Sequence, residues 1–282
     1  MTINEWVKKV CEDLQTRNFE NPSKESELLI QWILGISWSE FILKRNEEFP
    51  QAKLQELEKN WNRLQSGEPL AYIRGYQDFY KFQFYVDQNV LIPRPETEII
   101  VEECLKQRAS ESLKVMDLGT GSGCIGLSVA KELPLSEVWL FDSSSNALAM
   151  AKKNASSLNL SNIHFVQAQV GVETQLLPEL LGSIDFVLAN PPYIAQGDSR
   201  VHWRTEKFEP PTALYGNNNG LEWIHKWLTW SYDYLKPNAQ GIFEFGEGQE
   251  KEIEALLKNS AYQSYEFIKD YSDKWRFVLF KK

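Results

Sequence analysis

Residues 113–126, LKVMDLGTGSGCIG, decide how most of this chain of 282 residues folds. The apolar residues of LKVMDL predict a short buried strand, and CIGLSVAKEL, residues 124–133, predicts a helix directly after it. Gly119, Gly121 and Gly123 separate the two elements. Glycine permits the backbone angles of a tight turn and lets a ligand approach the backbone closely. The stretch therefore indicates an α/β sheet with a binding loop at the carboxyl edge of its strands.

The same alternation of strand and helix continues to the end of the chain. Further strands are predicted at 137–142, 163–168, 184–189 and 241–245, with two more between 265 and 282, and further helices at 145–158, 220–235 and 249–259. Short strands that alternate with helices predict an open, doubly wound sheet of the α/β class.

The chain before this sheet has a different pattern. Residues 1–73 predict a small N-terminal helical bundle, because apolar residues recur there at helical spacing. Ser37 and Glu40 have the spacing of a capping box before one short helix. Residues 74–94 contain the alternating stretch FYKFQFYV and predict a β-hairpin linker. We therefore expect a helical domain, a linker, and a sheet domain over residues 95–282.

The composition is that of a globular protein, with 43% hydrophobic residues and a net charge of −9. No apolar run reaches the roughly 18 residues that a membrane-spanning helix needs, and the charged N-terminus differs from a signal peptide. We therefore expect a cytoplasmic protein with no membrane partner. The negative charge disfavours a nucleic-acid partner, because such proteins usually carry a basic surface. The cysteines and histidines are few and scattered, so we expect neither disulfides nor a metal site.

Two acidic residues beside the glycine turn bear on its ligand. Asp142 ends the next predicted strand, where its carboxylate can accept hydrogen bonds from both hydroxyls of a ribose. Residues 121–126, GSGCIG, match the dinucleotide pattern of NAD-dependent oxidoreductases. Asp117 before the turn instead suits the D-x-G-x-G-x-G pattern, which resembles that of S-adenosylmethionine-dependent methyltransferases. Because a carboxylate attracts a cationic sulfonium and repels a pyrophosphate, we favour S-adenosyl-L-methionine as cofactor.

A second motif, FVLANPPYIA at residues 186–195, ends a strand at the same edge of the sheet. The side chain of Asn190 has one acceptor and one donor group. Pro191 and Pro192 lack N–H groups and hold their carbonyls in restricted directions, and Tyr193 adds a flat ring. Two fixed acceptors beside a flat ring suit a planar NH₂ group. The motif therefore indicates methyl transfer to an amine or amide nitrogen, with positioning as the main catalytic resource.

Nearly the whole chain resembles the PrmC/HemK family of N5-glutamine methyltransferases of peptide chain release factors. The resemblance is carried by GEPLAYIRGYQDFY, VLIPRPETEIIVE, VMDLGTGSGCIGLSVA, FDSSSNALAMAKKNA, DFVLANPPYIA and LEWIHKWLTWSYDYLKPNAQGIFEFG, in the order of the family. It implies a Rossmann-like class I methyltransferase sheet and an N-terminal domain that recognises the release factor. The substrate it implies is the glutamine of the Gly-Gly-Gln motif in class 1 release factors.

The resemblance also implies roles for individual residues. The positions expected to bind the methyl donor are Asp117, Gly119, Thr120, Gly121, Ser122, Gly123, Asp142, Val170 and Asn190. The positions expected to bind the glutamine are Asn190, Pro191, Pro192 and Tyr193, of which Asn190, Pro191 and Tyr193 are the expected catalytic residues. No metal is implied.

Two positions depart from the pattern of the family. Gln169 stands where an acid is usual, which bears on donor affinity, and Pro211 stands where an arginine is common, which bears on partner contact. The Asn-Pro-Pro-Tyr motif also occurs in methyltransferases that act on exocyclic amines of DNA or RNA, and this activity is the nearest alternative. An NAD-dependent oxidoreductase and a non-catalytic binding module are the more distant alternatives.

Overall fold

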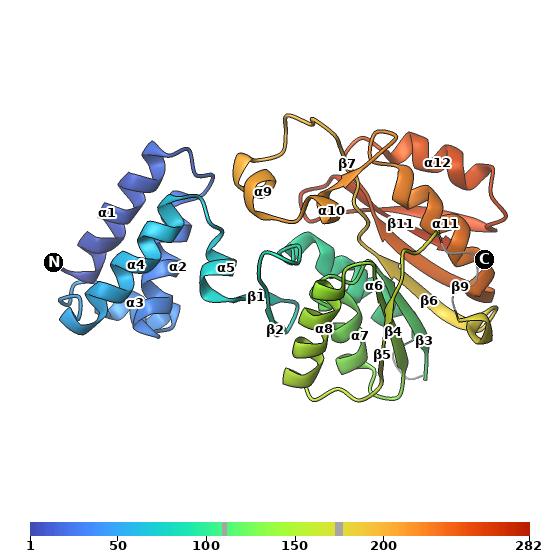
Figure 1. Ribbon diagram of the computed structural model, residues 1–282, viewed down its shortest axis with the longest axis horizontal. Helices are drawn as coiled ribbons and strands as arrows, with labels where there is room; N and C mark the ends of the chain where they lie inside the picture. Colours follow the sequence, from blue (N-terminus) through green and yellow to red (C-terminus); the bar gives the residue numbers. More distant parts are fainter. Residues whose placement is uncertain (109–111, 173–176) are drawn as a thin grey trace. The chain divides into compact units, whose positions relative to one another are not determined.

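The computed structural model describes residues 1–108, 112–172 and 177–282 (Figure 1). It divides into two compact units, Met1–Gly75 and Tyr76–Lys282. In the part of the chain described, no helix is long and apolar enough to cross a membrane.

The first unit is helical, as the apolar spacing predicted. Its elements are α1 (Ile3–Thr16), α2 (Pro22–Leu34), α3 (Trp38–Lys44), the 3₁₀ turn η1 (Gln51–Lys53), α4 (Leu54–Gln65) and α5 (Leu70–Arg74). The predicted capping box opens α3: the Glu40 amide donates to Ser37 Oγ at 3.3 Å, and the Ser37 amide donates to Glu40 Oε2 at 2.9 Å. One apolar face of each long helix forms a common core that includes Val10, Leu29 and Leu64.

The second unit begins with the hairpin of β1 (Tyr76–Phe79) and β2 (Phe82–Tyr85). Its main strands are β3 (Lys114–Leu118), β4 (Glu137–Asp142), β5 (Ile163–Gln167), β6 (Ile184–Ala189), β9 (Leu235–Glu244), β10 (Ser264–Lys269) and β11 (Trp275–Lys281). Among the described residues these form one seven-stranded sheet in the order β10-β11-β9-β6-β3-β4-β5. The strands from β9 to β5 run parallel, and β11 is antiparallel to both of its neighbours.

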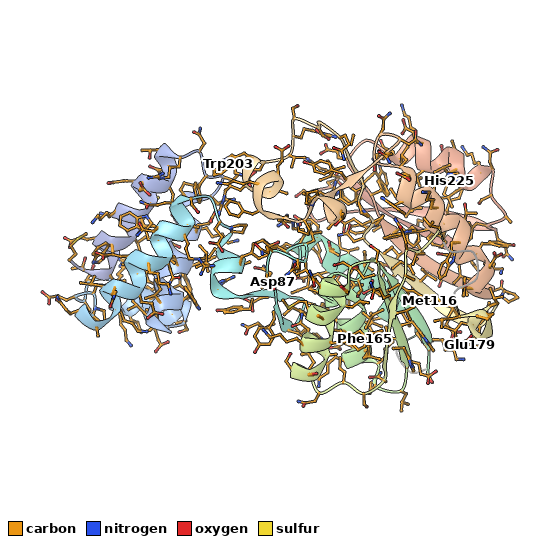
Figure 2. The ribbon with its side chains drawn as sticks, viewed as in Figure 1. Asp87, Met116, Phe165, Glu179, Trp203 and His225 are labelled. Atoms are coloured by element: carbon orange, nitrogen blue, oxygen red, sulfur yellow. The ribbon has the colours of Figure 1, made fainter. Side chains whose placement is uncertain are left out.

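Helices cover both faces of this sheet, which confirms the doubly wound α/β fold (Figure 1). One face packs against α6 (Glu98–Arg108), α7 (Cys124–Glu132) and α8 (Ser145–Ser157), and the other packs against α11 (Glu222–Tyr234) and α12 (Glu250–Lys258). Neighbouring strand residues belong to opposite layers: Val115 packs with the first set of helices and Met116 with the second. This alternation follows from the two-residue repeat of a strand. Figure 2 shows Met116 within the sheet and His225 on α11.

The segment after β6 holds several short elements that the sequence patterns did not predict. They are β7 (Ile194–Ala195), α9 (Trp203–Phe208), α10 (Pro211–Leu214) and β8 (Tyr215–Gly216); the 3₁₀ turns η2 (Pro95–Thr97) and η3 (Pro178–Leu180) complete the unit. β9 is also longer than the predicted strand at 241–245, since it starts at Leu235. Its first half contains Pro237 and Asn238, residue types that are common in turns and rare in strands, and they hide the strand.

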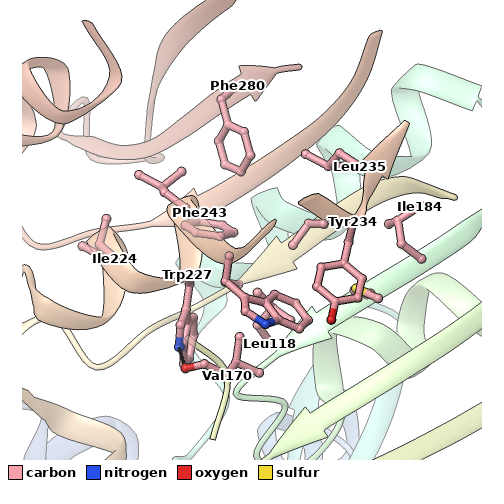
Figure 3. Packing of buried hydrophobic residues seen from close by; sticks show 14 of the residues in the cluster. Leu118, Val170, Ile184, Ile224, Trp227, Tyr234, Leu235, Phe243 and Phe280 are labelled. Atoms are coloured by element: carbon pink, nitrogen blue, oxygen red, sulfur yellow. Dashed lines mark hydrogen bonds between the residues drawn. The ribbon is translucent and has the colours of Figure 1, made fainter. Parts of the chain in front are cut away.

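The apolar layer over α11 and α12 gives a test of what stabilises this unit (Figure 3). Phe243 is fully buried, and its ring packs edge to face against that of Phe280, with 5.0 Å between the ring centroids. We expect Phe243→Ala to lower the free energy of unfolding by about 3–5 kcal/mol in urea titrations. As the control, Leu135→Ala removes a side chain that is 75% exposed and should change it by no more than about 0.5 kcal/mol. Equal effects of the two substitutions would contradict this assignment of the core.

Candidate functional site

A cavity of about 440 Å³ lies at the carboxyl edge of the sheet. Its wall comes from the turns that follow β3, β4, β5 and β6, from residues 89–91, from the segment 210–217 and from α11. Predicted site residues on this wall are Gly119, Gly121, Asp142, Val170, Asn190 and Pro192. The other predicted residues, Asp117, Thr120, Ser122, Gly123, Pro191 and Tyr193, are not among the described residues that line it. The size suits a small organic ligand.

Gly119 brings the glycine turn against an aromatic ring of α11. Its φ of +69° lies in the left-handed region, and a Cβ atom built on it would approach the ring of Trp227 to 2.6 Å. The indole of Trp227 is fixed by a hydrogen bond from Nε1 to the Val170 carbonyl, at 3.1 Å (Figure 3). Only glycine satisfies both the backbone angle and this contact.

Asp142 ties the end of β4 to the glycine turn. Its carboxylate accepts hydrogen bonds from the Gly121 amide and the Ser144 amide, each at 2.9 Å. Burial raises the pKa of Asp142, and these backbone donors oppose that effect. Because the carboxylate also lines the cavity, its remaining lone pairs can accept hydrogen bonds from a ligand. Gln169, the departure noted in the sequence, lies on the cavity wall as well.

Asp117 braces the turn from behind. Its Oδ2 accepts hydrogen bonds from Thr120 Oγ1 at 2.6 Å and from the Gly126 amide at 3.0 Å. The carboxyl group is fully buried, and Oδ1 has no hydrogen-bond partner among the described residues. Burial therefore raises the pKa of Asp117 to about 6. These contacts are with the turn rather than with the cavity.

The Asn-Pro-Pro-Tyr loop leaves the end of β6 with both of its polar side chains engaged. Asn190 Nδ2 donates to Thr97 Oγ1 at 3.2 Å, and the Tyr193 hydroxyl donates to Glu244 Oε1 at 2.9 Å. The Tyr193 carbonyl accepts a hydrogen bond from Gln249 Nε2 at 3.0 Å. Burial raises the pKa of Tyr193, so its hydroxyl keeps its proton. The loop is therefore held by groups from three other segments of the unit.

The sequence patterns did not identify Thr97 or Glu244 as site residues. Each gave a signal, however. Thr97 lies inside LIPRPETE, the stretch of the family resemblance without an assigned chemistry, and Glu244 is an acid within the apolar strand GIFEF. An ionisable residue inside an otherwise apolar strand requires a specific partner.

Arg94 of LIPRPETE has a partner that the sequence did not reveal. Its Nη2 donates to Glu209 Oε1 at 2.5 Å, and Glu209 Oε2 accepts from the Ile92 amide at 3.0 Å. Glu209 is only 3% exposed, whereas the Arg94 side chain is 37% exposed, so the pair joins two segments at the edge of the buried region. Pro210, the next residue, lines the cavity. The ion pair thus fixes one part of the cavity wall.

The described residues contain no cluster of three or more His, Cys, Asp or Glu side chains that could hold a metal ion.

Substitution of Gly119 separates backbone strain from the contact with Trp227. We expect Gly119→Ala to lower the urea midpoint much more than Gly182→Ala, because both positions have positive φ but an added Cβ at Gly182 meets nothing within 4 Å. The control should cost only the left-handed backbone penalty, about 1–2 kcal/mol. Similar midpoints for the two variants would show that the ring of Trp227 does not constrain the turn.

The raised pKa of Asp117 predicts a pH-dependent stability. With a folded-state pKa of about 6 and an ordinary value of 3.8, the folded chain binds more protons than the unfolded chain between these values. Stability from this group is therefore complete below about pH 4 and lost as the pH rises through 6, by up to about 3 kcal/mol. We expect the stability difference between the parent protein and Asp117→Asn to fall by this amount in urea titrations from pH 4 to pH 7. A constant difference would contradict the assignment.

Comparisons with known proteins identify the family of this chain. The model of the PrmC N-terminal domain matches residues 5–75, and the model of the methyltransferase small domain matches residues 95–209. A release factor glutamine methyltransferase of Buchnera aphidicola is 32% identical over 283 residues, which cover 100% of this chain and 99% of the relative. The enzyme of the same name from Escherichia coli is 30% identical over 281 residues, which cover 99% and 98%.

Solved structures agree on the fold. The hMettl16 catalytic domain gives a TM-score of 0.55 at 17% identity and covers 70% of this chain and 74% of that chain. A methyltransferase from Pyrococcus furiosus gives 0.53 at 16% identity and covers 80% and 98%. At such identities the likeness shows a methyltransferase-like fold alone. The relatives that align along nearly the full length carry the assignment further, and this chain belongs to the release factor glutamine methyltransferase family.

Proposed function

We propose that this protein transfers a methyl group from S-adenosyl-L-methionine to the side-chain amide nitrogen, N5, of the glutamine in the Gly-Gly-Gln motif of class 1 peptide chain release factors. The observation that carries the proposal is the position of Asn190. Asn190 lies on the cavity wall at the end of β6. The glycine turn, which follows the neighbouring strand β3, lies on the same wall. A hydrogen-bond acceptor for a planar NH₂ group and a turn suited to the methyl donor thus border one cavity.

The cavity residues fit the methyl donor. Gly119 and Gly121 expose backbone on the wall, Asp142 presents a carboxylate, and the amide of Gln169 can form hydrogen bonds with an adenine. When bound, S-adenosyl-L-methionine supplies an electrophilic methyl group on a sulfonium that leaves as a thioether. In our proposal Asp142 holds the ribose hydroxyls, and Val170 packs against the donor. Asp117 acts indirectly, since it shapes the turn.

The Asn-Pro-Pro-Tyr loop would bind the glutamine. Asn190 Oδ1 and the Pro191 carbonyl accept the two N–H groups of the substrate amide, while Pro192 and Tyr193 shape the slot. An amide nitrogen is a weak nucleophile because its lone pair is delocalised, so alignment with the methyl group is the main contribution of these residues. As the new N–C bond forms, the nitrogen becomes acidic and releases its proton to a weak acceptor. No strong general base is then needed.

The helical unit is our candidate for recognition of the release factor. It corresponds to the region matched by the PrmC N-terminal domain model. In the domain division predicted from the sequence, residues 1–73 recognise the release factor, residues 74–94 form the linker, and residues 95–282 form the methyltransferase domain. A protein substrate from the translation machinery is consistent with the cytoplasmic location predicted from the sequence. The proposal includes neither a membrane nor a nucleic-acid partner.

The direct test is methyl transfer in vitro. With labelled S-adenosyl-L-methionine and a class 1 release factor, we expect label on the glutamine of Gly-Gly-Gln, located by mass spectrometry. A release factor with glutamate in place of that glutamine should take up no label. Asn190→Ala should slow transfer about a hundredfold or more, by loss of a preorganised polar contact. Label on DNA or RNA but not on the release factor would contradict the proposed substrate.

A further inference from the structure

Three polar side chains form a continuous chain of hydrogen bonds behind the cavity wall. Asn190 Nδ2 donates to Thr97 Oγ1 at 3.2 Å, and Thr97 Oγ1 donates to Glu244 Oε2 at 2.6 Å. Thr97 is 2% exposed and Glu244 is 1% exposed, so water does not compete for either group. The cavity is bordered by Asn190 alone of the three.

The other oxygen of Glu244 is also occupied. The Tyr193 hydroxyl lies 2.9 Å from Glu244 Oε1, and Arg276 Nη2 lies 3.2 Å from the same hydroxyl. A guanidinium can only donate, so the Tyr193 oxygen accepts from Arg276 and its hydrogen points to Glu244. Burial raises the pKa of Glu244, and the hydrogen bond from Thr97 and the charge of Arg276 oppose this. In the hydrogen bonds of the structure the Thr97 and Tyr193 hydroxyls are the donors, so both carboxylate oxygens act as acceptors.

This pattern fixes which group donates in each of the hydrogen bonds that link Asn190, Thr97 and Glu244. Because Glu244 Oε2 is the acceptor in the bond with Thr97, the only hydrogen of the Thr97 hydroxyl points to Glu244. The Thr97 oxygen is then an acceptor for Asn190, which can satisfy it only with its NH₂ group. The amide oxygen of Asn190 is consequently turned away from Thr97. An Asn side chain without such a partner could adopt either of two orientations that differ by exchange of its oxygen and nitrogen.

We propose that Thr97 and Glu244 are positioning residues that hold the Asn190 amide with its oxygen towards the substrate. The inference rests on the proposed function, because a glutamine NH₂ group needs an acceptor at this point. The reverse orientation would place two NH₂ groups against each other. Glu244 orients Tyr193 through its other oxygen, so one buried carboxylate sets two residues of the loop.

The sheet explains how residues so distant in sequence meet. β6 and β9 run parallel with Ala189 opposite Phe243, so Asn190, which follows β6, and Glu244, the last residue of β9, lie at the same edge of the sheet. Thr97 enters from η2, directly before α6. A buried carboxylate is costly unless hydrogen bonds compensate it. Here the compensating donors are the hydroxyls of Thr97 and Tyr193.

Substitutions at Thr97 separate the hydroxyl from the packing. We expect Thr97→Val to lower kcat about ten- to a hundredfold and to change the dissociation constant of the methyl donor, measured by calorimetry, less than about threefold, since the wall of the donor site is unchanged. Thr97→Ser, the matched control, retains the hydroxyl and should recover most of the rate. Urea unfolding of both variants checks that each one folds.

A second readout does not depend on catalysis. In the parent protein, one hydrogen of the Asn190 side-chain NH₂ is bonded to Thr97 and should exchange slowly with solvent in NMR measurements. Thr97→Val should speed this exchange about tenfold, in proportion to one lost hydrogen bond, whereas Thr97→Ser should not. The Asn190 signal is identified by its absence from Asn190→Ala.

Glu244→Gln tests whether Glu244 is the origin of the fixed orientation of the Asn190 amide. Thr97 and Tyr193 donate to different oxygens of Glu244, and a glutamine places its NH₂ group, which cannot accept, at one of these two positions. We therefore expect a loss of kcat comparable to that of Thr97→Val. The double variant should be little slower than either single one, because both remove the same arrangement. Multiplicative losses would overturn the inference.

The remaining outcomes separate this inference from the proposed function. Full activity in Thr97→Val, or equal losses in Thr97→Val and Thr97→Ser, would overturn the positioning role while the proposed function stands. If the parent protein does not methylate a release factor but Thr97→Val alone still speeds the exchange of the Asn190 NH₂, the proposed function fails and the orientation by Thr97 stands.

Discussion

The parallel pairing of β6 with β3 on one side and with β9 on the other is the constraint on which the site depends. Leu118 lies opposite Ala189, and Ala189 lies opposite Phe243. Each of these residues is followed by a group of the site: Gly119, Asn190 and Glu244. A slip by one residue between β6 and β9 would direct alternate side chains to the wrong layer and separate Asn190 from Glu244. The apolar core and the polar site therefore require the same register.

The core also reaches the site directly through Trp227. Its ring belongs to the apolar layer of α11 and is 6% exposed, yet it lines the cavity and restricts the glycine turn. The hydrogen bond to Val170 joins the same ring to the segment after β5. One aromatic side chain thus connects the turn after β3 with the loop after β5. Substitutions in the layer around α11 are expected to affect ligand binding through this connection.

The sequence predicts those parts of the site that local patterns determine. Strand periodicity places Asn190 at the end of β6, and the glycines mark the turn after β3, because both depend on neighbouring residues. The contact between Thr97 and Glu244 joins positions 147 residues apart, and its existence depends on strand order and register rather than on any local pattern. The same limit applies to Arg94 and Glu209. Asp117 shows a related limit. Its place in the D-x-G-x-G-x-G pattern predicted a residue that binds the methyl donor, but its hydrogen bonds are with the glycine turn and it does not line the cavity.

The distance between Glu244 and the cavity has a chemical consequence for methyl transfer as proposed. A carboxylate in the place of Asn190 would be a stronger nucleophile than the substrate amide and would compete for the methyl group. The side-chain amide of Asn190 is a weak nucleophile, but alone it would not be fixed in one orientation. With Thr97 between them, Glu244 can determine that orientation while it stays buried at 1% exposure. The arrangement combines a neutral group at the reacting nitrogen with the directing effect of a buried carboxyl group that does not border the cavity.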